Sequence, residues 1–438
     1  MNNIQSVSDS FLCSNCGACK AICPTRAISM KLSSIGRMYA SVNEDCIDCG
    51  LCTKVCPSLN QPLVEDSHIG CINSVFTGRA TDEQIFMNAQ SGGVCTAILK
   101  YLFEHHKIDC AVVCRMSFGE FPIVESVAIE NVSQLHSTQK SCYTPVDMLS
   151  RLRNVKDKES VAFVGLPCQI QGLTHLQKTS KSYRNVKYKL GLICERTLCG
   201  GIQNVFLAKA KQKGINPSLF KIDWKRKAFI ANGNFYTYGN APIVLYTKSE
   251  EYVIPNVYRF LLKDFFTPPR CRICEDKMNA SADIVLGDPW GMKNIEMRYG
   301  ESVIITRTAK GDELIREMKQ GGILKLIRRD SSEIIQGQHI NERKISVATY
   351  SKAFNVLPLS VNSYLLDKSE GILVNNKEKN KCERELLNFL SLEKRTKKEI
   401  VAMALKIIER YERIHDNFLY HFLSRVRNKI VFILKRYK

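Results

Sequence analysis

Long apolar runs are missing from this sequence. No stretch of its 438 residues approaches the roughly 20 apolar residues that a membrane-spanning helix needs. The first residues also lack a basic segment followed by an apolar stretch, so we expect no secretory signal. Charged residues make up 24% of the chain and hydrophobic residues 45%, which excludes disordered, fibrous and collagen-like proteins. We therefore expect a cytoplasmic protein of about two to four domains.

Cysteine and positive charge, by contrast, are abundant. The 19 cysteines do not suit a small disulfide-bonded scaffold, because the chain is long and shows no export signal. In a reducing cytosol, many cysteines at short spacings indicate metal sites. The net charge of +20 favours an anionic partner, but residues 1–66 are slightly acidic and no basic–aromatic pattern or recognition helix is found. A nucleic-acid partner is therefore not expected.

Two cysteine motifs dominate the first 66 residues. Residues 13–24 read CSNCGACKAICP and residues 46–57 read CIDCGLCTKVCP, and both follow the pattern C-x2-C-x2-C-x3-C-P of bacterial two-cluster ferredoxins. Short turns point the first three thiolates of a motif at one cluster, whereas the fourth cysteine is expected to begin a helix that faces the other cluster. Gly17 and Gly50 let the backbone pass close to the sulfides. The expected ligands are Cys13, Cys16, Cys19 and Cys56 for one [4Fe–4S] cluster and Cys46, Cys49, Cys52 and Cys23 for the other.

Zinc is the alternative for these cysteines, because zinc sites also use C-x2-C pairs. Zinc sites combine two pairs, however, and do not explain a triplet followed by an offset Cys-Pro that occurs twice. Between the motifs, residues 27–30 and 38–42 are predicted to form a small hairpin.

From residue 67 onward, short apolar runs alternate with helical patterns, which predicts an α/β body. The expected strands cover residues 111–114, 161–165, 190–194, 283–287 and 303–306. The expected helices cover residues 94–105, 202–212, 313–319 and 333–339. The predicted organisation is an α+β ferredoxin-like two-cluster head (residues 1–66), the α/β body (67–350) and a linker with a helical basic tail (351–438). Residues 375–380, NNKEKN, are the clearest linker by composition.

Two loops of the body carry residues suited to an anionic cofactor. Ser91, Gly92 and Gly93 precede a predicted helix, whose free N–H groups suit a phosphate, although such residues also serve as a plain helix cap. Lys140 fits either an anion site or a solvated surface.

Cysteines at strand ends are the stronger signal in the body. Cys168 and Cys194 follow two expected strands, where sites form in open α/β sheets. Together with the C-x2-C pair Cys271 and Cys274 they could bind a third cluster. Zinc for the pair and buried apolar thiols for the other two are the alternatives, and Cys199 competes with Cys194 as a ligand.

Six short segments of the body resemble the family of coenzyme F420 hydrogenase/dehydrogenase beta subunits. These segments are residues 91–94, 140–143, 164–169, 191–194, 270–274 and 282–291. The resemblance implies an α/β flavin-binding body with a four-iron cluster beside FAD, often behind a fused ferredoxin head. It assigns the third [4Fe–4S] cluster to Cys168, Cys194, Cys271 and Cys274. It assigns the flavin to Ser91, Gly92, Gly93, Lys140, Gly165 and Gln169, with Asp283 and Asp288 nearby. Cys142 lies where many members of the family have another residue.

The cofactors together predict an iron–sulfur flavoprotein oxidoreductase. Electrons would come from a donor protein such as a ferredoxin, pass through the clusters to FAD, and reach an organic substrate. The basic body favours an anionic substrate, and the resemblance implies a sugar-class substrate in cell-surface polysaccharide biosynthesis. Candidate proton donors are His136, His175 and Tyr143. The alternative is an electron-carrier subunit that relays electrons to a partner protein and has no substrate site.

The tail is predicted to form an amphipathic helix over residues 398–423. Its apolar stripe consists of Ile400, Met403, Ile407, Tyr411, Ile414 and Phe418. The basic residues around and beyond it include Arg410, Arg413, Arg425, Arg427, Lys429, Lys435, Arg436 and Lys438. One interpretation packs the stripe on the body, and the other makes the tail a peripheral anchor on the inner face of an anionic membrane, ending in the apolar residues 430–434.

Overall fold

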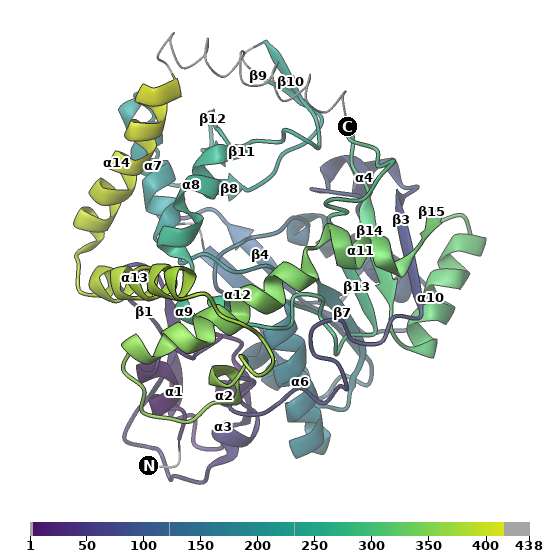
Figure 1. Ribbon diagram of the computed structural model, residues 1–438. Coiled ribbons are helices and arrows are strands. Elements are labelled where there is room, and N and C mark those ends of the chain that lie inside the picture. The colour runs from purple at the N-terminus through teal and green to yellow at the C-terminus, as the bar shows by residue number, and fades with distance from the viewer. Residues whose placement is uncertain (1–2, 122, 232, 416–438) are drawn as a thin grey trace.

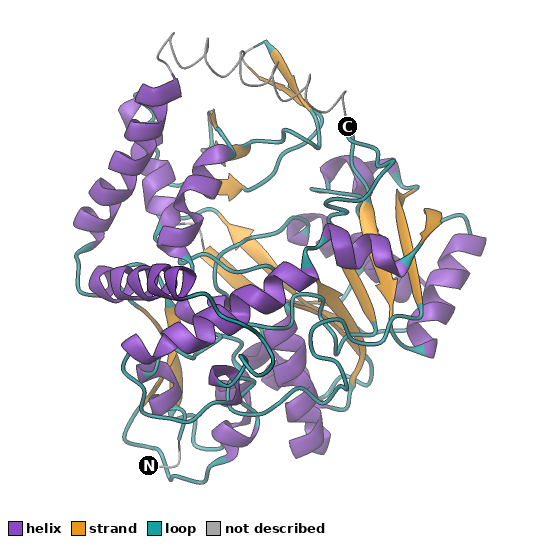
Figure 2. Cartoon of the chain, in the orientation of Figure 1, coloured by secondary structure: helices purple, strands orange, loops and turns teal. Residues whose placement is uncertain are grey.

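Eight strands of the body form one mixed sheet, which the other parts of the chain surround (Figures 1 and 2). The structure is a computed structural model that describes residues 3–121, 123–231 and 233–415. In spatial order, the eight strands are β15 (Leu324–Arg329), β3 (Ser74–Ala80), β14 (Ser302–Thr306), β13 (Ile284–Gly287), β7 (Val186–Leu192), β6 (Val161–Gly165), β4 (Cys110–Ser117) and β5 (Ile123–Ile129). Strands β13, β7, β6 and β4 are parallel. Strand β3 shares their direction, because β14 separates it from β13 by two antiparallel pairings.

The five strands expected from the sequence are β4, β6, β7, β13 and β14, and all are confirmed. Strand β7 ends at Leu192, two residues earlier than expected, so that Cys194 lies in the loop beyond the strand. The parallel strands end at one edge of the sheet, where ligand sites of open α/β sheets form. That edge therefore collects the loops that follow β3, β4, β6, β7 and β13.

The four helices expected from the sequence are present, although two of them begin two to four residues earlier than expected. The expected helices are α5 (Val94–Glu104), α7 (Ile202–Gln212), α10 (Ala309–Gln320) and α11 (Ser331–Gly337). The others are α4 (Glu83–Asn88), α6 (Pro167–Thr179), α8 (Val257–Phe266), α9 (Pro269–Arg272) and the 3-10 turns Val132–Thr138, Leu149–Val155 and Lys181–Tyr183. Two small antiparallel sheets complete the body: β8 (Lys221–Asp223), β11 (Ile243–Tyr246) and β12 (Glu251–Ile254) form one, and β9 (Phe229–Ala231) and β10 (Asn234–Tyr236) the other.

The head is a ferredoxin-like unit at the N-terminal end, purple in Figure 1. Its elements are α1 (Gln5–Asp9), α2 (Ala18–Ile22), β1 (Ile28–Leu32), β2 (Met38–Val42) and α3 (Leu51–Lys54). The predicted hairpin is confirmed as the antiparallel pair of β1 and β2. The expectation that the fourth cysteine begins a helix is wrong: Cys23 and Cys56 follow the short helices α2 and α3. Gly17 and Gly50 begin these helices at φ of 87° and 72°, a left-handed backbone that glycine adopts without strain.

The head shares a hydrophobic core with later parts of the chain. Ile4, Val7 and Leu12 of the head belong to the same buried cluster as Phe206 of α7 and Phe389 near the C-terminal end. The tip of the β1–β2 hairpin also binds the start of α7, because Gly200 N donates to Gly36 O at 2.8 Å. The head is therefore fixed on the body by packing and by backbone hydrogen bonds.

The C-terminal region is helical and folds back over the head and α8. It consists of α12 (Ile340–Ala353), two 3-10 turns (Phe354–Val356 and Tyr364–Leu366), α13 (Asn376–Glu393) and α14 (Lys397–His415). Residue 350, the expected end of the body, lies inside α12. The expected linker at 375–380 is wrong, since Asn375 caps α13 by accepting a hydrogen bond from Lys377 N at 2.8 Å. No described helix is long and apolar enough to cross a membrane.

The tail helix packs on α7 and α8. Its buried residues are Ile400, Ala404 and Ile408, so the buried stripe is centred one residue away from the predicted one, and Met403 and Ile414 are exposed. Lys209 of α7 binds Glu412 of α14 at 2.9 Å. Phe418, the basic residues from Arg425 to Lys438 and the apolar residues 430–434 lie outside the described residues.

Candidate functional site

Four cysteines of the head surround one cavity. Cys13, Cys16 and Cys19 of the first motif meet Cys56 of the second around about 290 Å³ of atom-free space. The remaining lining is mainly apolar and includes Ile4, Val7, Met30 and Pro57. The fourth cysteine of each motif lines the cavity of the other motif because the short helices α2 and α3 end just before Cys23 and Cys56.

The other four head cysteines surround a second cavity. Cys46, Cys49 and Cys52 meet Cys23 around about 310 Å³ of atom-free space. Cys49 and the neighbouring Ile47 are exposed, whereas Cys16, Cys19 and Cys56 at the first cavity are buried. The second cavity is therefore the one nearer to the protein surface.

Both cavities fit iron–sulfur clusters by the chemistry of their donors. Thiolate sulfur is the ligand of such clusters, and each cavity offers four thiols. Burial raises the pKa of the Cys16 thiol to about 11 and that of Cys56 to about 12, so their thiolates require bound cations, which iron would supply. Among the described residues, no three His, Cys, Asp or Glu side chains converge as a site for one metal ion requires.

A third set of cysteines gathers where the head meets the body. Cys168 lies in the first turn of α6 and Cys194 in the loop after β7, while Cys271 lies in α9 and Cys274 just beyond it. Burial and then the neighbouring thiols Cys16, Cys274 and Cys194 raise the pKa of Cys168. The Cys194 thiol likewise has Cys271 and Cys274 as charge neighbours. The four cysteines predicted as a cluster site are thus brought together, and Cys168 is also close to the head.

Cys199, the competing ligand, has different surroundings. It is fully buried in the shared hydrophobic core, and its backbone N–H donates to Phe266 O at 2.8 Å. The charged groups that act on its thiol are first Glu393 and Arg37 and then Cys271. Cys194 rather than Cys199 faces both members of the C-x2-C pair.

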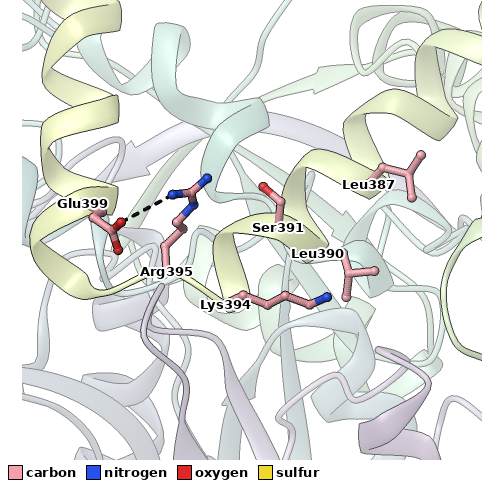
Figure 3. Close-up of a pocket in the computed structure, with 6 residues that line it drawn as sticks. All are labelled: Leu387, Leu390, Ser391, Lys394, Arg395 and Glu399. Atoms are coloured by element: carbon pink, nitrogen blue, oxygen red, sulfur yellow. Dashed lines mark hydrogen bonds and ion pairs between the residues drawn. The ribbon is translucent and has the colours of Figure 1, made fainter.

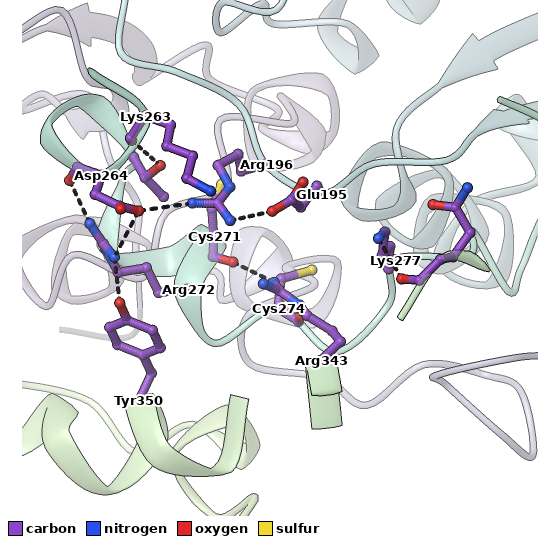
Figure 4. A network of polar contacts seen from close by, with 12 residues as sticks. Glu195, Arg196, Lys263, Asp264, Cys271, Arg272, Cys274, Lys277, Arg343 and Tyr350 are labelled. Carbon is purple, nitrogen blue, oxygen red and sulfur yellow. Dashed lines mark hydrogen bonds and ion pairs between the residues drawn. The ribbon is translucent and has the colours of Figure 1, made fainter. Parts of the chain in front are cut away.

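Arginines hold the loop of the third set in place (Figure 4). Arg343 of α12 donates to the carbonyl oxygens of Cys271 and Cys274, both at 2.7 Å. Arg272 donates to Tyr350 Oη at 2.6 Å and binds Glu385 of α13 at 2.6 Å. The C-terminal helices therefore position the C-x2-C loop, a role that the sequence did not reveal.

Arg270 joins the third set to the head. It is 3% exposed, and its Nε donates to Ser58 Oγ at 2.9 Å. Its guanidinium has the Cys274, Cys168 and Cys271 thiols and the Tyr364 hydroxyl as charge neighbours, and it also lowers the pKa of Cys56 against the larger effect of burial. A buried cation thus lies between thiols of the head and thiols of the body.

The Ser-Gly-Gly loop and Lys140 meet around two buried partners. Ser91 Oγ lies 2.8 Å from Ser302 Oγ, which also accepts from Gly92 N at 3.0 Å. Lys140 Nζ donates to Asp223 Oδ2 at 2.7 Å. Gly93 is the left-handed N-cap of α5, and a Cβ on Gly92 would lie 2.4 Å from Gly78 O. Gly92 is therefore needed for close packing and Gly93 for its left-handed backbone, roles that agree with a plain helix cap.

Gly165 and Gln169 make a separate set of contacts at the start of α6. Gly165 O accepts from Asn279 Nδ2 at 2.9 Å. Gln169 Oε1 accepts from Leu166 N at 2.8 Å and so caps the helix that carries Cys168. The six residues predicted to hold flavin thus fall into two groups with different polar partners.

Two buried lysines in the segment after β8 belong to this site but were not predicted from the sequence. Lys225 Nζ binds Asp288 at 2.9 Å and lies 3.6 Å from the Tyr238 ring centre. Lys227 donates to the carbonyl oxygen of Ser91, and burial, followed by the nearby Lys225, lowers its pKa to about 7. The run KRK at 225–227 was the available signal, but it resembles a solvated surface segment.

The other candidate residues are divided between the site and the rest of the fold. Tyr143 is at the site: its ring centre lies 5.6 Å from that of Trp224, and Asp288 and Cys194 are among its charge neighbours. His136 is exposed on a 3-10 turn and His175 is buried in α6. Asp283 lies at the amino end of β13, at the opposite edge of the sheet from Asp288, where it binds Lys310 at 3.0 Å. The expectation that Asp283 and Asp288 share a site is therefore wrong.

A further surface pocket lies between α13 and α14 (Figure 3). Its lining residues are Leu387, Leu390, Ser391, Lys394, Arg395 and Glu399. Arg395, in the bend between the two helices, forms an exposed ion pair with Glu399 of α14. None of the predicted site residues lines this pocket.

Comparison with known proteins finds three matching family profiles. The profile described as coenzyme F420 hydrogenase/dehydrogenase, beta subunit N-term, matches residues 75–153, and the one for the C terminus of that subunit matches residues 158–332. A 4Fe–4S dicluster domain matches residues 12–60. Iron–sulfur clusters in the head are thereby supported independently of the structure.

Curated relatives carry oxidoreductase names. The chain is 28% identical over 346 residues to the coenzyme F420-dependent sulfite reductase of Methanocaldococcus jannaschii, covering 74% of this chain but only 49% of that protein. It is 27% identical to a subunit of the F(420)H(2) dehydrogenase of Methanosarcina mazei, covering 76% of this chain and 94% of the relative. It is 26% identical to the beta subunit of the coenzyme F420 hydrogenase of Methanosarcina barkeri, covering 64% of this chain and 96% of the relative.

A solved structure shares the fold. A chain of the F420-reducing [NiFe] hydrogenase complex from Methanosarcina barkeri aligns with a TM-score of 0.50 at 20% identity, covering 67% of this chain and 94% of the other. The expected α/β body is thus confirmed, with a mixed sheet, together with the iron–sulfur head. The two beta-subunit profiles follow one another along the body, in the region that contains the six short segments. The chain therefore belongs to the family of coenzyme F420 hydrogenase/dehydrogenase beta subunits and is an iron–sulfur-containing subunit of the oxidoreductase type.

Proposed function

We propose that this chain is an iron–sulfur flavoprotein oxidoreductase that exchanges electrons between a partner protein and an anionic organic substrate. Iron–sulfur clusters carry single electrons and a flavin takes or gives one or two, so the two cofactors together match a one-electron partner to a two-electron substrate. The observation that carries the proposal is the position of Cys168, whose thiol has Cys16 of the head and Cys194 and Cys274 of the body as neighbours. A continuous path of cysteine sets from the head into the body is what such a protein requires.

Three sets of residues would hold the clusters. The cluster nearest the surface would be held by Cys46, Cys49, Cys52 and Cys23. The buried cluster would be held by Cys13, Cys16, Cys19 and Cys56. Cys168, Cys194, Cys271 and Cys274 would hold the third. The exposure of Cys49 and Ile47 supports the surface set as the place where the partner, a ferredoxin or another electron-donor protein, docks.

The basic groups at the carboxyl edge of the sheet would hold FAD and the substrate. Lys140, Lys225 and Lys227 offer cationic nitrogen atoms beside the Ser91 loop, and their charge suits a pyrophosphate or an anionic substrate. Tyr143 carries a hydroxyl near Asp288 and the third cysteine set, and it would donate a proton to the substrate. Gly165 and Gln169 would shape the side of the site that adjoins Cys168.

Anaerobic counts of iron, sulfide and flavin, with EPR of the reduced protein, test the proposal. We expect about 12 irons and one flavin per chain if three clusters and FAD are bound. Lys140→Met should lower the flavin content, because it removes the cation that binds Asp223. Lys310→Met is the matched control, since Lys310 pairs with Asp283 at the opposite edge of the sheet. A flavin-free protein with a full complement of iron would contradict the proposal.

An electron-carrier subunit without its own substrate site is the second candidate. The names of two relatives, a hydrogenase subunit and a dehydrogenase subunit, favour it, because such subunits work in larger assemblies. Iron and sulfide without flavin would support this function and distinguish it from the first. The names of the relatives also make coenzyme F420 a candidate acceptor.

Two finer expectations stay predictions from the sequence. A role in cell-surface polysaccharide biosynthesis rests on the resemblance alone. Peripheral membrane binding rests on the residues after His415, whereas the packing of α14 on α7 and α8 supports the alternative that the tail helix is part of the fold. Liposome sedimentation of the full chain and of a chain ending at His415 tests the anchor, and equal pelleting would discard it.

A further inference from the structure

Two cysteines outside the three sets lie in contact. The Sγ atoms of Cys114 and Cys142 are 3.4 Å apart. Cys114 lies on β4, and Cys142 lies on the loop that also carries Lys140 and Tyr143. Neither thiol has a role in the proposed function.

Neighbouring contacts hold this loop against β4 and β5. Ser126, the cross-strand partner of Cys114 on β5, donates from its hydroxyl to Asp147 O at 2.8 Å. At the other end of the loop, Ser141 N donates to Gln90 Oε1 at 3.1 Å. The thiol–thiol contact therefore lies in a segment that is fixed on both sides of Cys142.

We propose that Cys114 and Cys142 form a reversible disulfide when the protein meets a low-molecular-weight disulfide. A disulfide has an S–S distance of about 2.05 Å, so the two sulfurs need to approach by only about 1.4 Å. A shift of this size is within reach of side-chain rotation and small backbone adjustment. The pair is thus a modification site next to the predicted flavin loop.

The order of attack follows from exposure and hydrogen bonding. Cys114 is partly exposed and Cys142 is buried. The hydrogen bond from the Cys142 thiol lowers the pKa of Cys114, which favours the thiolate at Cys114. The Cys114 thiolate attacks the small disulfide and releases one small thiol, leaving a mixed disulfide. Cys142 then attacks the Cys114 sulfur and releases the second small thiol, so two electrons and two protons pass from the protein to the reagent.

The disulfide would tie the loop of Lys140 and Tyr143 to β4. Both residues have a left-handed backbone, with φ of 83° and 53°, so the loop already adopts a conformation that few side chains favour. Lys140 binds the buried Asp223, and Tyr143 packs on Trp224. Oxidation of the pair would therefore change the position of groups that surround the proposed flavin site.

Peptide mapping under controlled thiol–disulfide conditions tests the proposal. The full-length holoprotein is equilibrated without oxygen in mixtures of reduced and oxidised glutathione, treated with iodoacetamide and digested with trypsin. We expect the peptides 108–115 and 141–151 to appear as one cross-linked species under the more oxidising mixtures. Its abundance should follow a two-electron transition, with a tenfold change in the oxidised-to-reduced ratio per 29.6 mV. Fragmentation assigns the bridge to Cys114 rather than to Cys110 in the same peptide.

Serine variants and iron counts provide the controls. Cys114→Ser and Cys142→Ser should each abolish the cross-link, whereas Cys95→Ser should leave it, although the Cys95 thiol also has Cys114 as a charge neighbour. Iron measured in the same samples shows that cluster thiols have not been released. The proposal is overturned if both wild-type cysteines stay fully alkylated across the whole range, or if Cys114 is found bridged to Cys95.

Discussion

The Nε atom of Arg270 donates a hydrogen bond to Ser58 Oγ at 2.9 Å, and this contact joins the body to the head two residues after Cys56. Arg270 and Ser58 are both almost fully buried. An arginine without access to water is normally paired with anions or bound by hydrogen bonds. Here its charge neighbours are the Cys274, Cys168 and Cys271 thiols together with the Tyr364 hydroxyl, which makes the guanidinium a fixed positive charge among the proposed cluster ligands.

Replacing Arg270 by Gln should lower the reduction potentials of the third cluster and of the buried head cluster. A nearby positive charge stabilises the reduced, more negative form, at an energy of about 2 kcal/mol for a separation of about 8 Å and an effective dielectric constant near 20. That energy corresponds to a shift on the order of 100 mV for one electron. Potentiometric titration followed by EPR measures it. Arg270→Lys keeps the charge, so its potentials should stay near those of the wild type. Potentials that are unchanged in the Gln variant as well would contradict this role.

Replacing both Cys271 and Cys274 by Ser should remove one EPR signal and leave those of the head. These cysteines belong to the third set, whereas the head cavities are lined by eight other cysteines. Iron should fall from about 12 to about eight per chain. Cys199→Ser is the matched control, because Cys199 is buried in the hydrophobic core and should not alter the iron content. Loss of the head signals in the double variant would show that the ligand sets are wrong.

The sequence predicts the head better than the flavin site because the head is specified locally. Each motif places three cysteines within seven residues, so spacing alone indicates the sets that surround the two cavities. Asp223, by contrast, lies on the three-residue strand β8 and meets Lys140 across 83 positions of sequence. Contacts of that range depend on the tertiary fold, and neither residue carries a local pattern that predicts its partner.

The prediction of a linker at residues 375–380 is wrong for a related physical reason. Its polar composition is typical of a loop, but Asn375 is also a good N-cap residue, and α13 begins directly after it. The apolar residues that hold the helix, Cys382, Leu386 and Phe389, occur only later, at helical spacing. Residues 375–380 alone contain the N-cap and the polar first turn of α13 but none of its apolar residues, so they do not indicate a helix.

Replacing Glu412 by Ala should destabilise the docking of the tail helix. Both carboxylate oxygens of Glu412 bind Lys209 Nζ, at 2.9 and 3.0 Å, and Lys209 is almost buried. Loss of the carboxylate leaves this cation without its partner, at a cost of about 1–2 kcal/mol once the partial exposure of Glu412 is allowed for. The thermal midpoint of unfolding should fall by about 1–2 °C. Glu409→Ala on the same helix is the control, since Glu409 has no ion pair among the described residues, and an equal loss in both variants would contradict the role of the pair.

Flavin affinity should decrease as the pH rises above about 7, because Lys227 then loses its charge. Burial, and next the nearby Lys225, lowers the pKa of Lys227 to about 7, so the side chain is cationic below that pH and neutral above it. A bound phosphate raises this pKa, and linkage then requires the affinity to fall by up to about tenfold per pH unit above 7. Fluorescence titration of the flavin-free chain with FAD from pH 6 to pH 9 measures the change.

Variants and a second ligand separate Lys227 from other groups that titrate in this range. Lys227→Arg keeps its charge, so its FAD affinity should stay high at every pH, whereas Lys227→Met should bind weakly at every pH. Riboflavin has no phosphate, and its affinity for the wild-type chain should therefore be weak and nearly independent of pH. Since the carbonyl oxygen of Ser91 accepts a hydrogen bond from Lys227, the two substitutions also report whether the Ser-Gly-Gly loop is where the phosphate binds. The same pH dependence in the Met variant and in the wild type would assign the titration to another group and remove Lys227 from the site.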